Sequence, residues 1–207
     1  MAPTYNPKKH HRRSIRLKGY DYTQPGEYFV TICTHNRNCL FGQVVNGQVE
    51  LNEYGQIVAA EWEKSPMIRR ELELDVFVIM PNHLHGIVNI VGAIGVGAIG
   101  QSPLHQSSTG ANSYSPLSPG AAPKSLGAFI IGFKSAVTKQ INQWRGTPGL
   151  PVWQRNYYEH IIRSNRALEA IRHYIEQNPR RWELDRYNPS ATDRDPQAAM
   201  LWELLKG

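Results

Sequence analysis

Two histidines, His83 and His85, are the residues of this chain whose types and spacing point most directly to chemistry. They follow an apolar run that ends at Met80 and a turn at Pro81-Asn82. Because side chains alternate between the two faces of a strand, both imidazoles point to one face and Leu84 to the other. Two imidazoles side by side on a rigid strand form half of a metal site, although an isolated pair of this kind also occurs without any function.

A phenol and a carboxamide come together at the end of a helix predicted much later in the chain. Asn178 precedes Pro179, and a residue before proline is pushed out of the α region. We therefore expect Asn178 at the last helical position or just beyond it. Tyr174 lies four residues earlier, one turn back on the same face, so this helix end presents both side chains together.

Two histidines and one amide oxygen would leave open positions on a bound ion. Imidazole with oxygen ligands suits Mn²⁺ or Mg²⁺, whereas structural zinc normally has four protein ligands. An ion with open positions can hold a phosphodiester oxygen and neutralise the charge that builds up at phosphorus. Tyr174 could then attack that phosphorus and form a covalent phosphotyrosine. Because this bond keeps the energy of the broken one, the step can run backwards and rejoin DNA strands.

Other residues compete for these roles. Tyr157 and Tyr158 are alternative nucleophiles, because one of two consecutive residues on an extended segment must face the same side as the site. Aromatic packing is the commoner fate of such a pair. His160 and His173 are alternative ligands, although hydrogen-bonded histidines without a metal are the simpler interpretation.

The composition narrows the class of protein. The 207 residues, 41% of them hydrophobic, suit one domain with elaborations or a domain with a tail. No run approaches the roughly eighteen apolar residues of a membrane span, and residues 1–18 lack the apolar region of a signal peptide. Cys33 and Cys39 do not suggest a disulfide framework, so we expect a cytoplasmic protein.

The net charge of +6 is concentrated in two basic regions. Basic arms attract polyanions by releasing counterions, so we expect contact with nucleic acid. Guanidinium groups grip phosphate in a bidentate manner and do not act as bases, which favours DNA contacts over catalysis for the arginines. The expected DNA-binding residues are Lys8, Lys9, Arg12, Arg13 and Arg16 of an N-terminal arm, with Arg155, Arg163 and Arg180 nearer the candidate site.

Hydrophobic periodicity and turn residues predict an alternation of strands and helices. Asn46-Gly47 is a strong hairpin signal, and Asn52, Ser125 and Ser164 are candidate N-caps. The predicted elements are a strand at 27–34, a hairpin of 41–45 and 48–51, a helix from 53 ended by Pro66, strands at 75–80 and 84–91, a helix at 126–144, an extended segment at 152–163, a helix from 165, and a short helix at 198–205. This order predicts an α+β fold with a ferredoxin-like, split β-α-β antiparallel sheet and helices on one face.

A long insertion interrupts this order. Val91-Gly92-Ala93-Ile94-Gly95 is followed at once by Val96-Gly97-Ala98-Ile99-Gly100, and the residues up to Pro123 are mostly Ser, Pro, Gly, Gln and Ala. Such a composition cannot offset the entropy of ordering. We therefore expect one domain over residues 1–185, with a flexible insertion at 92–123 inside a loop, and a C-terminal tail at 186–207 with a short helix.

Three blocks of the sequence resemble the single-tyrosine HUH transposases, and within these most closely the REP-associated tyrosine transposases. The resemblance covers about residues 10–185 without the insertion. Three blocks in the right order are more specific than the histidine pair alone. They are Met80-Pro81-Asn82-His83-Leu84-His85-Gly86-Ile87, then Trp153-Gln154-Arg155 with Glu159-His160-Ile161-Ile162-Arg163, then Tyr174-Ile175 with Asn178-Pro179.

This resemblance implies nicking and rejoining of single-stranded DNA at hairpin-forming repeats. Tyr174 would correspond to the nucleophile, forming a 5′-phosphotyrosine and releasing a 3′-hydroxyl. His83 and His85 would be paired ligands of Mg²⁺ or Mn²⁺, and Asn178 the third ligand. The 92–123 insertion departs from the compact family pattern, and we expect it beside the site without contributing to it.

Two other classes stay open from the sequence. The chain could bind DNA hairpins without cleaving them, or it could be a divalent-metal phosphodiesterase that uses water as its nucleophile. In each case the expected partner is single-stranded or hairpin DNA, without a membrane. A monomer and a homodimer are both compatible with the sequence, as is a Tyr174 that serves its own histidines or those of a second subunit.

Overall fold

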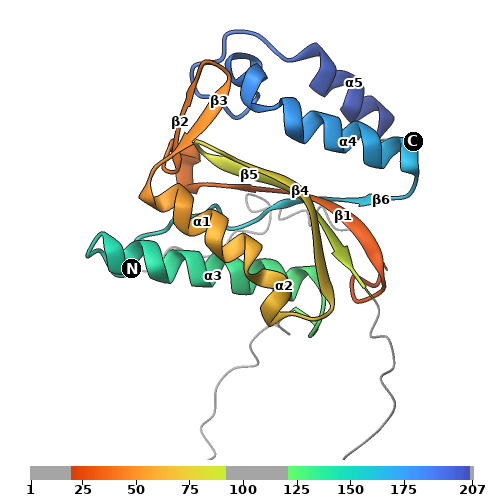
Figure 1. The fold of residues 1–207 in the computed structure, drawn as a ribbon, viewed down its shortest axis with the longest axis horizontal. Helices are drawn as coiled ribbons and strands as arrows, with labels where there is room; N and C mark the ends of the chain where they lie inside the picture. Colours follow the sequence, from red (N-terminus) through yellow and green to blue (C-terminus); the bar gives the residue numbers. More distant parts are fainter. Residues whose placement is uncertain (1–19, 92–120, 206–207) are drawn as a thin grey trace, which may run out of the picture.

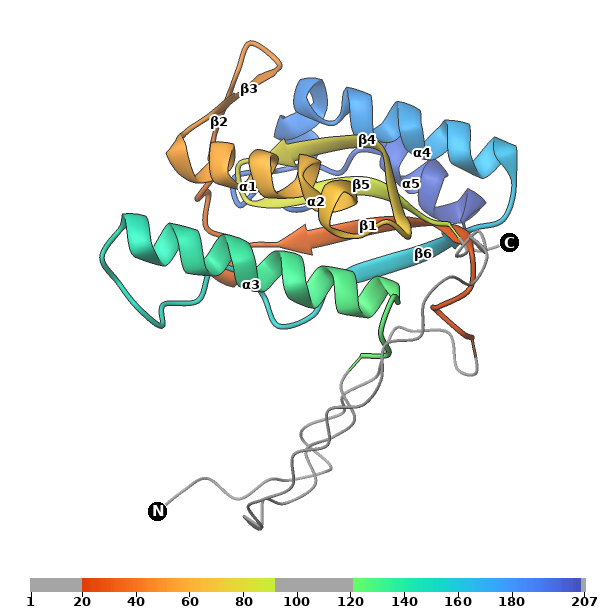
Figure 2. The same ribbon diagram turned by 60° about the horizontal axis from the view of Figure 1, so that its bottom comes forward.

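A four-stranded antiparallel sheet forms the centre of the protein. The structure is a computed structural model and describes residues 20–91 and 121–205. The strand order is β4-β5-β1-β6, which is the order of a ferredoxin-like sheet (Figure 2). These strands are β1 (Gly26–Cys33), β4 (Leu72–Met80), β5 (His83–Ile90) and β6 (Tyr158–Ile162). The α+β, ferredoxin-like fold predicted from the sequence is confirmed.

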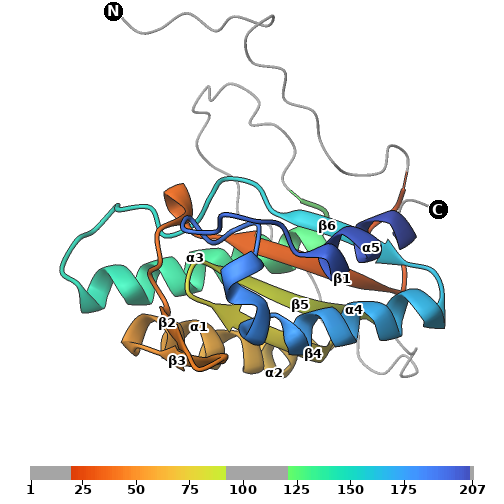
Figure 3. The ribbon, with the colours of Figure 1, turned by 90° about the horizontal axis from the view of Figure 1, so that it is seen from above.

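Helices cover both faces of this sheet (Figure 1). One face carries α1 (Glu53–Glu63), α2 (Ser65–Ile68) and α3 (Leu126–Trp144). The opposite face carries α4 (Asn165–Gln177) and α5 (Pro196–Leu204), which lie side by side in Figure 3. The prediction that the helices occupy one face was therefore wrong. Burial of β1 on both faces explains why, because its two side-chain rows enter two separate apolar clusters, one on each side of the sheet.

Alternation along the central strands assigns each residue to one of these clusters. Tyr28, Val30 and Ile32 of β1 face α3, whereas Phe29 packs beneath α4. On β5, Leu84 faces the α3 side and Ile87 the α4 side. A residue two positions from Ile87 shares its face. The two histidines therefore lie on the α4 side of the sheet.

The predicted turns and caps are confirmed. The hairpin of β2 (Gly42–Val45) and β3 (Gln48–Leu51) turns at Asn46-Gly47, both of which have positive φ, as a type I′ turn requires. It stands beside the end of α4 in Figure 1. The side chains of Asn52, Ser125 and Ser164 each accept a hydrogen bond from the backbone N–H three residues on.

One local expectation about proline was wrong, and the reason given for a second, correct one did not apply. Pro66 does not end the first helix, because α1 already ends at Glu63 and Pro66 lies in the first turn of α2. Asn178 caps α4 as expected, but it keeps helical dihedrals (φ −56°, ψ −42°) despite preceding Pro179. The chain continues directly into a 3₁₀ helix, η2 (Pro179–Leu184), so helical dihedrals persist across the junction. A further 3₁₀ turn, η1, spans His35–Arg37.

Within residues 20–91 and 121–205, no helix combines the length and the apolarity that crossing a bilayer requires.

Candidate active site

The two histidines lie side by side and are fully buried on β5. Their ring centroids are 4.5 Å apart, and both residues have no exposed surface. The antiparallel register pairs His85 with Thr31 of β1, and directly paired residues bring their side chains together. Accordingly, Thr31 Oγ1 hydrogen-bonds with Nδ1 of His85 at 2.8 Å. The sheet therefore fixes the position of both rings.

Helix α4 carries Tyr174 and Asn178 to this pair. Its apolar stripe packs on the sheet, and Ile171, Tyr174 and Ile175 are buried along it. The hydroxyl of Tyr174 hydrogen-bonds with Nε2 of His85 at 3.3 Å. Asn178, one turn further on, is also buried. The structure thus brings together the four residues that the sequence predicted for the nucleophile and the metal ligands.

Asp185 joins these residues and was not predicted from the sequence. One ligand atom each from His83, His85 and Asp185 lie within 4.8 Å of one another. Asn178 Nδ2 donates to Oδ2 of Asp185 at 2.9 Å, and that oxygen is 3.9 Å from Nε2 of His83. Nothing in the local sequence distinguishes Asp185 from other acidic residues of the tail. Only the turn after η2 folds it back onto the histidines.

The potential ligand atoms of His83, His85, Asn178 and Asp185 fit a divalent cation. Among the described residues, Nε2 of His83 and Oδ1 of Asn178 are buried atoms without a hydrogen-bond partner. A buried acceptor without a partner is costly, and two of them beside a carboxylate form an environment that a cation would satisfy. Two imidazole nitrogens with carboxylate and amide oxygens form a mixed set of ligands that a divalent cation can use.

Burial keeps the histidines neutral, the state in which they bind metals. It lowers the pKa of His83 to about 3, an effect that the side chain of Asn178 partly opposes and the charge of Arg37 reinforces. Burial also lowers the pKa of His85 well below its usual value, with a smaller contribution from His83. Burial raises the pKa of Tyr174, and the charge of Asp185 adds to this. The phenol is therefore neutral in this arrangement.

Residues after η2 cover the site. The ring of Tyr187 lies 4.6 Å from that of His83, between centroids. Trp202 of α5 packs near Tyr174, and the guanidinium of Arg186 lies over the rings of both Tyr187 and Trp202. Arg37 approaches the Tyr187 ring from η1. The covering segment therefore brings aromatic and cationic groups next to the histidines.

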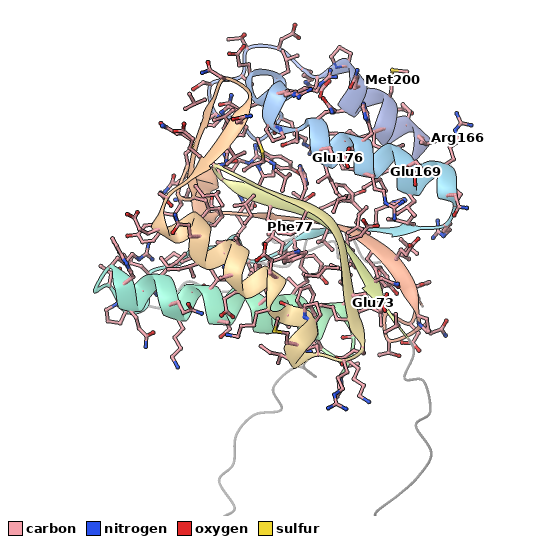
Figure 4. The ribbon with its side chains drawn as sticks, viewed as in Figure 1. Glu73, Phe77, Arg166, Glu169, Glu176 and Met200 are labelled. Atoms are coloured by element: carbon pink, nitrogen blue, oxygen red, sulfur yellow. The ribbon has the colours of Figure 1, made fainter. Side chains whose placement is uncertain are left out.

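A cavity of about 390 Å³ between α4 and α5 reaches the site from outside. Tyr174 and Asn178 both line it. Arg166 of α4 and Met200 of α5, labelled in Figure 4, line it from opposite helices. Its other walls combine apolar residues of α5 with the polar side chains of His173 and Gln177 on α4. The cavity therefore leads to the predicted nucleophile.

The alternative nucleophiles and metal ligands that the sequence suggested are not part of this group of residues. Tyr158 packs edge-on against Phe29 and Trp202, and Tyr157 packs against the apolar cluster on the α3 side. His173 is exposed on α4, and His160 is half-buried on β6. Within the described part of the chain, His83, His85 and Asp185 are the only group of three or more His, Cys, Asp or Glu residues arranged to hold a metal, and neither His160 nor His173 belongs to it.

The predicted DNA-binding residues are only partly described. Arg155, Arg163 and Arg180 are exposed. Arg155 lines a cavity of about 520 Å³ beside α3 that includes none of the site residues, and Arg180 packs beneath the tip of the β2–β3 hairpin at Gly47. The basic arm with Lys8, Lys9, Arg12, Arg13 and Arg16 lies outside the described residues, as does the 92–123 insertion except for its last three residues.

Comparison with known proteins gives one sequence relative and a fold. No protein-family model matches the chain. A protein of Haemophilus influenzae described as uncharacterized is 42% identical over 185 residues, which cover 89% of this chain and 97% of that protein. A solved structure of a REP-associated tyrosine transposase bound to a REP hairpin has a TM-score of 0.50 and 17% identity. The match covers 82% of this chain and 74% of that one. At this identity, the likeness concerns the fold.

Proposed function

The chain belongs to the same family as the Haemophilus influenzae protein and has a REP-associated tyrosine transposase-like fold, and we propose that it nicks and rejoins single-stranded DNA. The proposed activity is that of a divalent-metal-dependent endonuclease and strand transferase. It acts on hairpin-forming DNA through a covalent 5′-phosphotyrosine at Tyr174.

The observation that carries this proposal is the position of the Tyr174 hydroxyl. It lies 3.3 Å from Nε2 of His85, beside a group of donor atoms suited to a cation. A phenol next to a candidate metal site can attack a phosphodiester that the cation holds. Neither a pure binding protein nor a water-using hydrolase requires a tyrosine at this position.

The reaction forms one bond and breaks one. The Tyr174 oxygen bonds to phosphorus, the bond from phosphorus to the 3′-oxygen breaks, and the phenolic proton ends on the 3′-hydroxyl. His83, His85, Asn178 and Asp185 would hold the cation, which supplies positive charge to the phosphate and its developing negative charge. The reverse reaction, with a new 3′-hydroxyl, rejoins the strands.

Access to the site requires the covering segment to move. His83 and His85 have no exposed surface, Tyr187 packs against both, and Trp202 of α5 packs near Tyr174. We propose that residues 186–205 swing away when DNA binds, and that the strand then enters along the α4 wall of the present cavity. Arg37, Arg166 and Arg186 then become phosphate contacts, because each is exposed beside the cavity or the cover.

Hairpin DNA is the substrate that fits best. The solved transposase with this fold is bound to a REP hairpin. The present chain carries a net charge of +6 and the basic arm at its N-terminus, which favour a polyanionic partner. We propose that one chain supplies all of these site residues, so that the enzyme is competent as a monomer.

A denaturing gel tests the proposal. The protein is incubated with a labelled single-stranded oligonucleotide carrying a hairpin, with Mn²⁺ or Mg²⁺, and then boiled in detergent. We expect a covalent band for the native chain, none for His83→Ala or Tyr174→Phe, and an unchanged band for Tyr158→Phe, the matched control. Tyr174→Phe should retain Mn²⁺ binding.

The denaturing gel, run beside a native gel, separates the alternative functions. A hairpin-binding protein would shift the DNA on a native gel, with Tyr174→Phe binding equally well, and would give no covalent band. A water-using phosphodiesterase would shorten the oligonucleotide without becoming attached to it. Either result, over several metals and hairpins, would exclude the tyrosine mechanism.

A further inference from the structure

We propose that Asn82 is a positioning residue that fixes the tautomer of His83, so that Nε2 of this ring presents a lone pair to the cation. The inference deepens the proposed function and rests on the metal site described above. Asn82 touches neither the cation nor the DNA in this role. It acts through the imidazole of the next residue.

Hydrogen-bond geometry determines the orientation of the Asn82 amide. Its Nδ2 donates to the backbone oxygens of Arg37, at 3.0 Å, and Tyr187, at 2.7 Å. Both amide hydrogens are therefore used, and Oδ1 must be the atom that faces Nδ1 of His83, at 2.9 Å. An amide oxygen only accepts hydrogen bonds. Consequently, Nδ1 of His83 must be the donor and carries the hydrogen.

The other ring nitrogen is then free to act as a ligand. A neutral imidazole carries one hydrogen, so Nε2 of His83 is an acceptor with an unshared pair. That atom is buried, has no hydrogen-bond partner among the described residues, and lies 3.9 Å from the Asp185 carboxylate. Metal-binding histidines commonly donate their other N–H to an oxygen that fixes the ring, and Asn82 Oδ1 provides that oxygen.

The backbone around Asn82 supports this role. Pro81 and Asn82 form the two-residue turn between β4 and β5, a position normally exposed to solvent, yet Asn82 is fully buried. The backbone N–H of Thr34 donates to Asn82 O, and that of Phe41 to Pro81 O, both at 2.9 Å. The turn is thus fixed from a third segment of the chain, and Oδ1 cannot easily reorient.

His85 lacks an equivalent constraint. Its Nδ1 faces the hydroxyl of Thr31, and a hydroxyl both donates and accepts. Its Nε2 faces the hydroxyl of Tyr174, which has the same freedom. Either tautomer of His85 therefore satisfies its neighbours. Asn82 is the partner that imposes one direction, which makes His83 the fixed ligand of the pair.

Long-range ¹H–¹⁵N NMR of the metal-free protein tests the assignment directly. We expect His83 to carry its hydrogen on Nδ1 in the native chain. Observation of the hydrogen on Nε2 would overturn the proposal whatever any variant does. This measurement involves neither metal nor DNA, so it can fail while the proposed nuclease activity stands, and the reverse.

Substitutions separate positioning from a merely structural role. Asn82→Asp keeps the acceptor for His83 and loses both donors, so we expect Nδ1 to keep its hydrogen. Asn82→Ala loses the acceptor, so we expect mixed tautomers and a Mn²⁺ affinity lower by roughly 10- to 100-fold. Asn89→Ala is the control, because Asn89 of β5 bonds Glu73, and it should change neither quantity. If Asn82→Asp gave mixed tautomers as Asn82→Ala is expected to, or if Asn82→Ala bound Mn²⁺ normally, the proposal would be wrong.

Discussion

The hydroxyl of Tyr174 and Nε2 of His85 lie 3.3 Å apart, although the two residues are separated by 89 positions in the sequence. Helix α4 packs on the same chain's sheet through Ile171 and Ile175, and we expect Tyr174 to act with the histidines of that sheet. The sequence left open whether Tyr174 meets its own histidines or those of a partner. The packing of α4 favours the histidines of the same chain.

Complementation tests this arrangement. When Tyr174→Phe and His83→Ala chains are mixed, we expect no covalent adduct with hairpin DNA, because each chain lacks one half of its own site. The measurement is the denaturing gel, with native protein diluted into an inactive variant as the positive control. Recovery of the adduct in the mixture would mean that α4 is exchanged between subunits.

Asp185 should contribute to cation binding. We expect Asp185→Asn to lower the Mn²⁺ affinity by roughly tenfold or more, because it removes the negative charge nearest to Nε2 of His83. Calorimetric titration with Mn²⁺ measures this. Asp193→Asn is the control, because Asp193 is exposed in the same tail. An unchanged Mn²⁺ affinity together with faster DNA cleavage would instead identify Asp185 as an anion that occupies the phosphate position.

The buried histidines should make the metal-free protein sensitive to mild acid. The pKa of His83 is about 3 in the folded chain against 6.5 as its ordinary value. Between these values the unfolded chain binds a proton that the folded chain excludes, so stability is lost as the pH falls below about 6.5. For His83 alone, the loss is about 1.4 kcal/mol per pH unit.

Urea denaturation at pH 7 and pH 5 measures this effect. We expect the free energy of unfolding to fall less in His83→Gln than in the native chain. His173→Gln, which replaces an exposed histidine of α4, is the control substitution. Equal pH dependence in the native chain and His83→Gln would contradict the burial effect.

Gly86, in the sequence block that carries the histidines, should be required for packing. A Cβ atom at this position would lie 2.7 Å from Cζ2 of Trp62, a rigid indole on α1. We expect Gly86→Ala to lower the free energy of unfolding by about 1–3 kcal/mol. In a Trp62→Leu background the same substitution should cost less, and an equal cost in both backgrounds would exclude this contact as the cause.

Weakening the packing of the covering segment, residues 186–205, should speed cleavage if this segment must open before DNA enters. Trp202 contacts Phe29, Tyr158 and Tyr174, so Trp202→Ala should favour the open state. A loss of about 1–2 kcal/mol from the closed state would raise the open population by roughly 5- to 30-fold. Single-turnover adduct formation measures the rate, with Trp144→Ala on the exposed end of α3 as the control. A rate that stays the same or falls in a folded Trp202→Ala protein would contradict a closed resting state.

Much of the local structure was predicted from the sequence because it depends on neighbouring residues. The Asn46-Gly47 turn and the caps at Asn52, Ser125 and Ser164 use interactions within a few positions. The placement of His83 and His85 on one strand face follows from the same local geometry. The helical dihedrals of Asn178 show the limit of such rules, because η2 continues the helical path across Pro179.

The sequence by itself determined which residues alternate, cap and turn, and it placed two imidazoles on one strand face and a phenol with a carboxamide on one helix face. Only the tertiary structure decided which side of the sheet α4 covers, that Asp185 reaches the histidines and that Asn82 is buried against them. The physical reason is the separation along the sequence over which each kind of interaction acts. Strand and helix periodicities act over a few residues, whereas Asn82 bonds Tyr187 across 105 positions through a contact that no periodicity encodes.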